Sequence, residues 1–309
     1  MTLFLSEGDV RALLSPNDAV QAVEGCFQRM AAGAVHHAPR RRLELEEGRL
    51  ADMAASDLQL GYAGVKTYAA FREGTAFVVA LFSAERPELV ALLEADWLGR
   101  LRTGAASAVA AKHLARDGAA TLGVIGCGTQ AETQVRCIRA ALPALERVVA
   151  YCRTERHLQE FCENVGAEQG DSHRDAAAQD VVVTITTSRD PVLRGEWLQP
   201  GALVCAAGAN NGASRELDNV VLERASLVCC DWLAQARTES ADLIEPVETG
   251  VLDWLEVHEL HEVVSGELPG RQSADDIVVF KSNGIAAWDV AIAAAAVERA
   301  RERGVGKEL

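Results

Sequence analysis

The chain has 309 residues, of which 49% are hydrophobic and 24% charged, a balance typical of a globular protein with room for two domains. Its formal net charge of −15 repels phosphate backbones and anionic lipids, so we expect no nucleic-acid or membrane partner. No apolar stretch reaches membrane-spanning length and the N-terminus lacks a signal-peptide pattern, so we expect a cytoplasmic location.

The eight cysteines are irregularly spaced and form no CxxC pair. We therefore expect buried thiols in a reducing compartment rather than a zinc site. The adjacent His36 and His37 have no ligand-like neighbours in the sequence, and we expect them in a plain loop. The sequence thus predicts no metal site.

The N-terminal part of the chain is predicted to form a helix followed by a mainly antiparallel sheet. Ser15 can cap the helix, Pro16 takes its first position, and apolar residues recur at helical spacing up to Gly33. A long helix of small residues is expected from about residue 96 to 115. Between the two helices, alternating apolar residues and turn signals predict a hairpin of strands 43–45 and 50–53, then strands at 64–68, 76–82 and 89–93.

From Thr121 onward the pattern changes to short apolar strands alternating with helices, which is typical of a parallel, doubly wound sheet. Helices are expected at 130–141 and, in the alanine-rich C-terminal segment, at 286–303. The strands are expected at 122–125, 148–151, 181–186, 203–206, 227–230 and 277–280.

A glycine motif of the form GxGxxA lies between a predicted strand and a predicted helix. Gly126 permits a tight turn, Gly128 lets the backbone approach a pyrophosphate, and Ala131 is small enough for close helix packing. The N-terminus of the helix offers free N–H groups to the phosphates. The motif predicts dinucleotide binding; the alternative is a glycine-rich turn without a ligand.

The end of the second strand indicates which dinucleotide is bound. An acidic residue there would favour NAD through the ribose 2′-hydroxyl, but this chain has Cys152, Arg153 and Thr154. An arginine suits a 2′-phosphate, so we expect NADPH to be preferred, with NADH possible. The alternative is that Arg153 is a solvated loop residue.

Several further segments occur in one order along nearly the whole chain. They are Gly64-Val65-Lys66, Leu101-Arg102-Thr103-Gly104-Ala105-Ala106-Ser107, Ala111-Lys112-His113-Leu114-Ala115, the glycine motif, Gly208-Ala209-Asn210, Arg215-Glu216-Leu217-Asp218 and Phe280-Lys281-Ser282-Asn283-Gly284. In this combination the chain resembles the ornithine cyclodeaminase/mu-crystallin family.

That resemblance implies an α/β architecture in which a doubly wound Rossmann domain is inserted into an α+β domain. The domains are then residues 1–115 completed by the C-terminal helix 286–309, for substrate binding and dimerisation, and 116–285 for the dinucleotide. Family members are typically homodimers, and they hold an α-amino or α-imino carboxylate beside the nicotinamide.

The resemblance also implies that Arg40, Lys66 and Arg102 clamp the substrate carboxylate. Concentrated cations are what an acidic protein needs to bind a small anion. Arg102 stands among small apolar residues, where a buried guanidinium requires an anion. The alternative is that residues 40–42 are a solvated basic run and Lys66 a strand lysine with its ammonium in water.

Two positions depart from the pattern of the ornithine enzymes. Ala51 stands where they carry a glutamate for the distal ammonium, and Asn210 where they carry a catalytic aspartate. An asparagine amide does not ionise at working pH and cannot act as a general base. Deamination of ornithine is therefore disfavoured unless Asp57 or Glu44 substitutes.

We accordingly expect an NAD(P)H-dependent reductase of α-imino acids, of the ketimine or Δ1-pyrroline-2-carboxylate type, with Lys66 and Asn210 as catalytic residues. The alternatives are an ornithine cyclodeaminase, an alanine dehydrogenase-like enzyme, and a non-catalytic NADPH-loaded binding protein. The predicted cofactor contacts are Thr75, Arg102, Gly126, Gly128, Thr129, Gln130, Ala131, Arg153, Thr154, Thr186, Ala207, Gly208 and Ser282.

Overall fold

The computed structural model describes residues 1–309, which divide into two compact units. Unit 1 comprises residues 1–102 and 285–309, and unit 2 comprises residues 103–284. The division falls inside helix α3 (Asp96–Leu114), whereas the domain boundary predicted from the sequence follows that helix. None of the helices combines the length and the apolar character needed to cross a bilayer.

Unit 1 is built on a seven-stranded sheet in the order β15-β1-β6-β5-β4-β3-β2. Neighbouring strands are antiparallel except β1 and β6, which confirms the mainly antiparallel sheet. The strands are β1 (Leu3–Leu5), β2 (Val35–Leu45), β3 (Gly48–Asp57), β4 (Tyr62–Phe71), β5 (Gly74–Ser83), β6 (Leu89–Glu94) and β15 (Lys307–Glu308).

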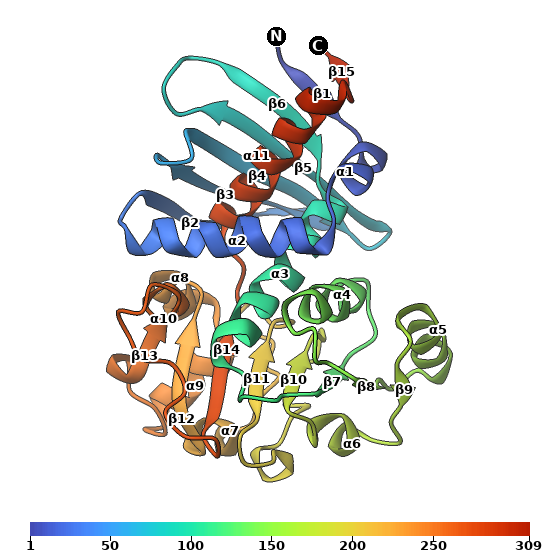
Figure 1. Ribbon diagram of the computed structural model, residues 1–309, viewed down its shortest axis with the longest axis vertical. Coiled ribbons are helices and arrows are strands. Elements are labelled where there is room, and N and C mark those ends of the chain that lie inside the picture. Colours follow the sequence, from blue (N-terminus) through green and yellow to red (C-terminus); the bar gives the residue numbers. More distant parts are fainter. The chain divides into compact units, whose positions relative to one another are not determined.

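Helices cover one face of this sheet. The long helices α2 (Pro16–Ala31) and α11 (Ala286–Arg303) pack against each other, and α11 lies across β2 to β5, as Figure 1 shows. The short helix α1 (Glu7–Leu13) packs on β6 and α11. Ser15 and Asp18 form a capping box at the start of α2, and Phe27 meets Trp288 of α11 edge to face, with ring centroids 5.4 Å apart. The predicted first helix and its cap are confirmed.

The opposite face of the sheet has no helix over it within unit 1. The strand register alternates, so that Met53 and its in-register neighbours face the helices while the residues between them face outward. Large apolar side chains are exposed on this outward face, namely Leu43, Leu45, Phe71, Val78 and Phe82. Exposed apolar side chains gathered on one face are typical of association sites.

Unit 2 is a wholly parallel, eight-stranded sheet in the order β13-β12-β14-β11-β10-β7-β8-β9, flanked by helices (Figure 1). Its centre has the doubly wound strand order, so the predicted Rossmann fold inserted into the first domain is confirmed. The strands are β7 (Thr121–Ile125), β8 (Arg147–Tyr151), β9 (Glu168–Gln169), β10 (Val181–Thr184), β11 (Leu203–Ala206), β12 (Ala225–Cys230), β13 (Val257–Glu259) and β14 (Ile277–Lys281).

The helices of unit 2 connect these strands, because parallel neighbours need crossover connections. They are α4 (Ala131–Ala141), α5 (Glu155–Val165), α6 (His173–Ala177), α7 (Asn219–Glu223), α8 (Leu233–Glu239), α9 (Ala241–Glu248) and α10 (Leu260–Val264), with 3₁₀ turns η1 (Gly195–Trp197) and η2 (Trp254–Glu256).

One sequence-based expectation about local structure is wrong. His36 and His37 lie inside β2 rather than in a loop, because this strand extends from Val35 and pairs residue by residue with β3. Its register shifts between Ala38 and Arg41, a bulge that accommodates the proline at position 39.

Candidate functional site

The glycine motif forms a tight turn at the carboxyl end of β7. The N–H of Gly126 donates to the carbonyl of Tyr151 at 2.9 Å, which ties the turn to the neighbouring strand β8. Gly126 has φ of 108°, and a Cβ there would lie 2.5 Å from the carbonyl oxygen of Ile185. Only glycine fits this position.

A pocket of about 380 Å³ opens at this turn, between the carboxyl ends of β7, β8 and β10. That is the switch point of the sheet, where doubly wound folds bind their ligands. A Cβ on Gly128 would meet no atom within 4 Å, so a ligand can approach its backbone. In the adjoining α4 the N–H of Ala131 donates to the carbonyl of Gly128 at 3.0 Å, but no side chain caps the helix at Gln130, so no side chain competes with a phosphate for the other N–H groups of the first turn. The residues present therefore fit a dinucleotide.

The chain after β8 supplies one wall of the pocket. Arg153 and Thr154 line it together with His157 and His173, and Arg153 is exposed. Burial lowers the pKa of His173, and the nearby Arg153 adds a smaller effect in the same direction. These groups can interact with an anion at the ribose end of a dinucleotide. Another arginine close in sequence, at position 156, forms an exposed ion pair with a glutamate of its own helix instead.

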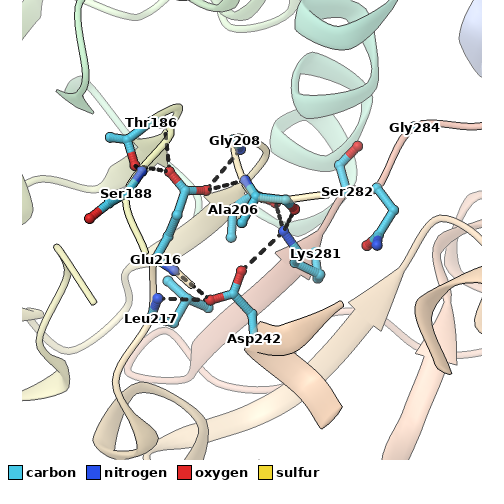
Figure 2. Close-up of polar contacts among 12 residues, drawn as sticks. Thr186, Ser188, Ala206, Gly208, Glu216, Leu217, Asp242, Lys281, Ser282 and Gly284 are labelled. Carbon is cyan, nitrogen blue, oxygen red and sulfur yellow. Dashed lines mark hydrogen bonds and ion pairs between the residues drawn. The ribbon is translucent and has the colours of Figure 1, made fainter. Parts of the chain in front are cut away.

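A buried carboxylate joins the loops that follow β10 and β11, as Figure 2 shows. One oxygen of Glu216 accepts hydrogen bonds from the backbone N–H and the hydroxyl of Thr186, at 2.7 and 2.8 Å. The other oxygen accepts from the N–H groups of Gly208 and Ala209, at 2.8 and 3.1 Å. Of the predicted site residues in these loops, Thr186 and Gly208 are bonded to Glu216, and Ala207 and Asn210 are next in sequence to bonded residues.

Lys281, at the end of β14, contacts the loop that follows β11. Its ammonium is 3.1 Å from Asp242, and it donates to the carbonyl of Ala209 at 2.5 Å. Asp242 also accepts from the N–H of Glu216 at 2.7 Å. The side chains of Glu216, Asp242 and Lys281 are fully buried. We call these three residues the buried triad. Sequence reasoning assigned it no role, although a lysine directly after the apolar strand 277–280 was a usable signal.

Two predicted site residues lie in loops beside the triad. Asn210 follows Ala209 in the loop after β11 and is half-buried. Ser282 follows Lys281 and is buried, with its hydroxyl 3.4 Å from the carboxylate of Asp231. Unit 2 thus brings the glycine turn and the loops around residues 186, 208 and 282 to the carboxyl ends of neighbouring parallel strands.

The predicted carboxylate clamp lies in unit 1, on the helix-covered side of the sheet. Arg40, Lys66 and Arg102 are each buried, with exposed fractions of 8%, 3% and 8%. Arg40 contacts the Met53 sulfur at 3.6 Å, and both arginines act electrostatically on Lys66. The alternative of a solvated basic run does not describe Arg40. It does describe the next residue, Arg41, which is exposed and paired with Asp52.

Asp289 of α11 completes this cluster. Its Oδ1 lies 2.9 Å from the ammonium of Lys66 and 3.5 Å from Nε of Arg102. Burial lowers the pKa of Lys66 to about 8, while Asp289 opposes that shift and the two arginines add to it. The anion that a buried Arg102 requires is therefore partly supplied by the protein. Sequence reasoning missed Asp289, although a lone carboxylate in the alanine-rich stretch 286–297 was a signal that it must be paired.

Thr75, predicted to contact the cofactor, lies exposed at the β4–β5 turn. Val79 is the strand partner of Lys66, and Thr75 lies four residues before Val79 on β5. Because side chains alternate along a strand, Thr75 is on the same face of the sheet as Lys66. Its assignment as a cofactor contact stays a prediction.

Comparison with known proteins identifies the class. The model of the ornithine cyclodeaminase/mu-crystallin family matches residues 1–304, and the chain belongs to this family. The chain is 36% identical over 320 residues to an alanine dehydrogenase of Archaeoglobus fulgidus, covering 100% of this chain and 98% of that protein.

Two solved structures share the whole fold. An archaeal alanine dehydrogenase dimer with bound NAD superposes with a TM-score of 0.93 at 35% identity, covering 100% of this chain and 98% of that one. A Δ1-pyrroline-2-carboxylate reductase of Thermococcus litoralis, in complex with NADH and L-proline, superposes with a TM-score of 0.92 at 30% identity, covering 100% of both chains.

Proposed function

We propose that this protein is an NAD(P)H-dependent reductase of α-imino acids. The observation that carries the proposal is the cluster of buried cations in unit 1, where Lys66 and Arg102 lie 2.9 and 3.5 Å from one oxygen of Asp289 and Arg40 acts electrostatically on Lys66. Buried charges are costly unless they are paired, so this cluster favours an incoming anion. A substrate carboxylate satisfies that requirement.

The side chains present can perform the remaining tasks. A nicotinamide cofactor supplies the hydride when bound. Arg40 and Arg102 would hold the carboxylate and so orient the imine, and orientation is a large part of such catalysis. Lys66, with a pKa of about 8, is close enough to neutrality to keep the imine nitrogen protonated or to donate to it. Asn210 can hydrogen-bond the substrate nitrogen or an ordered water.

For the cofactor we propose a preference for NADPH over NADH. Arg153 lines the pocket at the end of β8, and no acidic residue stands among residues 151–154 to accept the ribose hydroxyls. An arginine there suits a 2′-phosphate. The two similar structures were solved with NAD and NADH, so this preference would distinguish the present chain from them.

The alternative activities differ in which groups they need. Ala51 and Asn210 disfavour ornithine cyclodeamination, because neither offers the carboxylate that the resemblance implies at these positions. An alanine dehydrogenase is the second candidate, favoured by the similarity over the whole chain to a sequence and to a solved structure of that name. A pure NADPH-binding protein has little use for a buried cluster of three cations.

The test is a panel of substrates offered to the purified protein. We expect NADPH consumption with Δ1-pyrroline-2-carboxylate, Δ1-piperideine-2-carboxylate, or pyruvate with an amine. Proline and ammonia from ornithine without net cofactor use would establish a cyclodeaminase, and NAD-linked oxidation of alanine a dehydrogenase. No turnover with the whole panel would refute the proposal.

A comparison with a Lys66→Met variant separates enzymes from binders. An enzyme loses turnover while NADPH still binds in unit 2, because Lys66 belongs to unit 1. A pure binder has no turnover to lose.

We further propose that unit 1 binds substrate and forms a homodimer, and that unit 2 binds the dinucleotide. The outward apolar face of the unit 1 sheet supports dimerisation. We also propose a cytoplasmic location, because all eight cysteines are free thiols and most of them are buried.

A further inference from the structure

We propose that Glu216 is a positioning residue that holds the loops of residues 186–188 and 207–210 in the arrangement that the nicotinamide half of the cofactor requires. The proposal concerns a side chain that contacts neither cofactor nor substrate in the mechanism above. It goes beyond the proposed function, because it would hold for any activity that uses the dinucleotide site.

The hydrogen-bonding pattern defines the charge of Glu216. Its two oxygens accept from three backbone N–H groups and one hydroxyl, of Thr186, Gly208 and Ala209, and each of these groups can act as a donor. A carboxylate that receives four donors is held in its ionised form. Burial raises the pKa of Glu216 and the nearby Asp242 adds to that rise, while Lys281 and the hydrogen bonds from Thr186 oppose it. The four donors therefore hold a fully buried acceptor in place between the two loops.

The backbone groups that Glu216 binds belong to two different strand ends. β10 and β11 are hydrogen-bonded neighbours, and the dinucleotide of a doubly wound fold lies across the carboxyl ends of such strands. Because Arg153 marks the ribose end beside β8, the nicotinamide end falls on the side of β10 and β11. A carboxylate that couples these two loops controls the shape of that end.

The fit around Gly208 shows how closely the loops approach. A Cβ at this position would lie 2.3 Å from the amide nitrogen of Thr186 and 2.5 Å from Oε1 of Glu216. Lys281 holds the same loop through a hydrogen bond to the carbonyl of Ala209. Asn210, one of the two predicted catalytic residues, comes directly after Gly208 and Ala209, which are both bonded to Glu216. The position of Asn210 therefore depends on the hydrogen bonds that Glu216 accepts.

The experiment compares the affinity for the whole cofactor with the affinity for its adenosine half alone. In Glu216→Gln an amide NH₂ replaces one oxygen and faces N–H donors, so the two loops separate. We expect the affinity for NADPH, measured by calorimetry, to fall about tenfold or more, with kcat falling further than KM for the imine rises. The affinity for 2′,5′-ADP, which lacks the nicotinamide half, should stay within about twofold. If the wild type binds only NADH, NADH and 5′-AMP form the corresponding pair.

Asp180 provides a matched control. Its carboxylate accepts from the N–H groups of Ala120 and Thr121 and from the Thr121 hydroxyl, the same kind of bonds, but at the amino ends of β7 and β10. Asp180→Asn should lower the melting temperature without separating the affinities of NADPH and 2′,5′-ADP. A general loss of stability is thereby distinguished from a loss of positioning.

A second variant covers the case in which Glu216→Gln does not fold. Gly208→Ala forces the same two loops apart by steric contact and should give the same split between the two ligands. The proposal is overturned if the folded variant binds NADPH as tightly as the wild type, or if both affinities fall together. Absence of imine reduction by the wild type would refute the proposed function and leave this binding test intact.

Discussion

The ammonium of Lys66, on strand β4, lies 2.9 Å from a carboxylate oxygen of Asp289, on helix α11, and both side chains are buried. The two residues of this ion pair are 223 positions apart in the sequence. Lys66 experiences two opposing effects, because burial and the neighbouring arginines favour the neutral amine while Asp289 favours the ammonium. The balance leaves the pKa of Lys66 at about 8.

A pH dependence of reduction follows from this balance. If protonated Lys66 serves the imine, kcat/KM falls as pH rises through about 8, because the ammonium then loses its proton. In Asp289→Asn the group that raises the pKa of Lys66 is gone, so the decline moves to lower pH. Steady-state kinetics across the pH range test both statements. Asp18→Asn, which breaks a pair between Asp18 and Arg299 of the same helix, should leave the profile in place.

Replacement of Arg102 by alanine should weaken substrate binding. A charge-assisted hydrogen bond contributes about 1.5–3 kcal/mol, so we expect kcat/KM for the imine to fall roughly 10- to 100-fold. Arg100→Ala is the matched control on the same helix, because Arg100 is paired with Asp96. An equal loss of activity in both variants, or none in either, would contradict the clamp.

Arg153 is expected to decide between the two dinucleotides. Arg153→Ala should raise the KM for NADPH about tenfold or more and leave the KM for NADH within about twofold, because only NADPH carries the 2′-phosphate. Arg156→Ala should change neither, since Arg156 is engaged with Glu160 in an exposed pair. A wild type that prefers NADH from the outset would remove the basis of this prediction.

A charge on the outward face of the unit 1 sheet should separate the subunits of the proposed homodimer. Val78 is 40% exposed there, and Val78→Asp buries an unpaired carboxylate on association. Light scattering after size exclusion should show a dimer for the wild type and a shift toward monomer for the variant. Leu255 is 86% exposed in unit 2, and Leu255→Asp should leave the mass unchanged. A monomeric wild type would contradict the homodimer.

Local patterns in the sequence predicted much of the fold. Ser15 and Pro16 marked the start of α2, the change of rhythm after Thr121 marked the parallel sheet, and the glycine motif marked the turn after β7. These features arise from residues that are close together in the sequence, so the sequence alone reveals them. The short strands β1, β9, β13 and β15 were not predicted, because two or three residues carry no periodicity of their own.

The candidate site was predictable only in part, for a related reason. Resemblance and composition pointed to Lys66 and Arg102, but Asp289 lies 223 residues from Lys66 in the sequence, and only the folded sheet and helix bring them together. The buried triad is assembled in the same way from a loop, a helix and a strand end, at Glu216, Asp242 and Lys281. Partners that meet only through tertiary packing leave no spacing signal.

Unit 1 is assembled from both ends of the polypeptide, since Leu3 in β1 pairs with Glu308 in β15 and the covering helix α11 is also C-terminal. Unit 2, by contrast, is one uninterrupted stretch. On the ribosome unit 2 can therefore fold before unit 1 is complete, because the core of the N-terminal sheet stays uncovered until residues 285–309 have been synthesised. Because Asp289 belongs to that segment, Lys66 acquires its counterion only after unit 2 has been made.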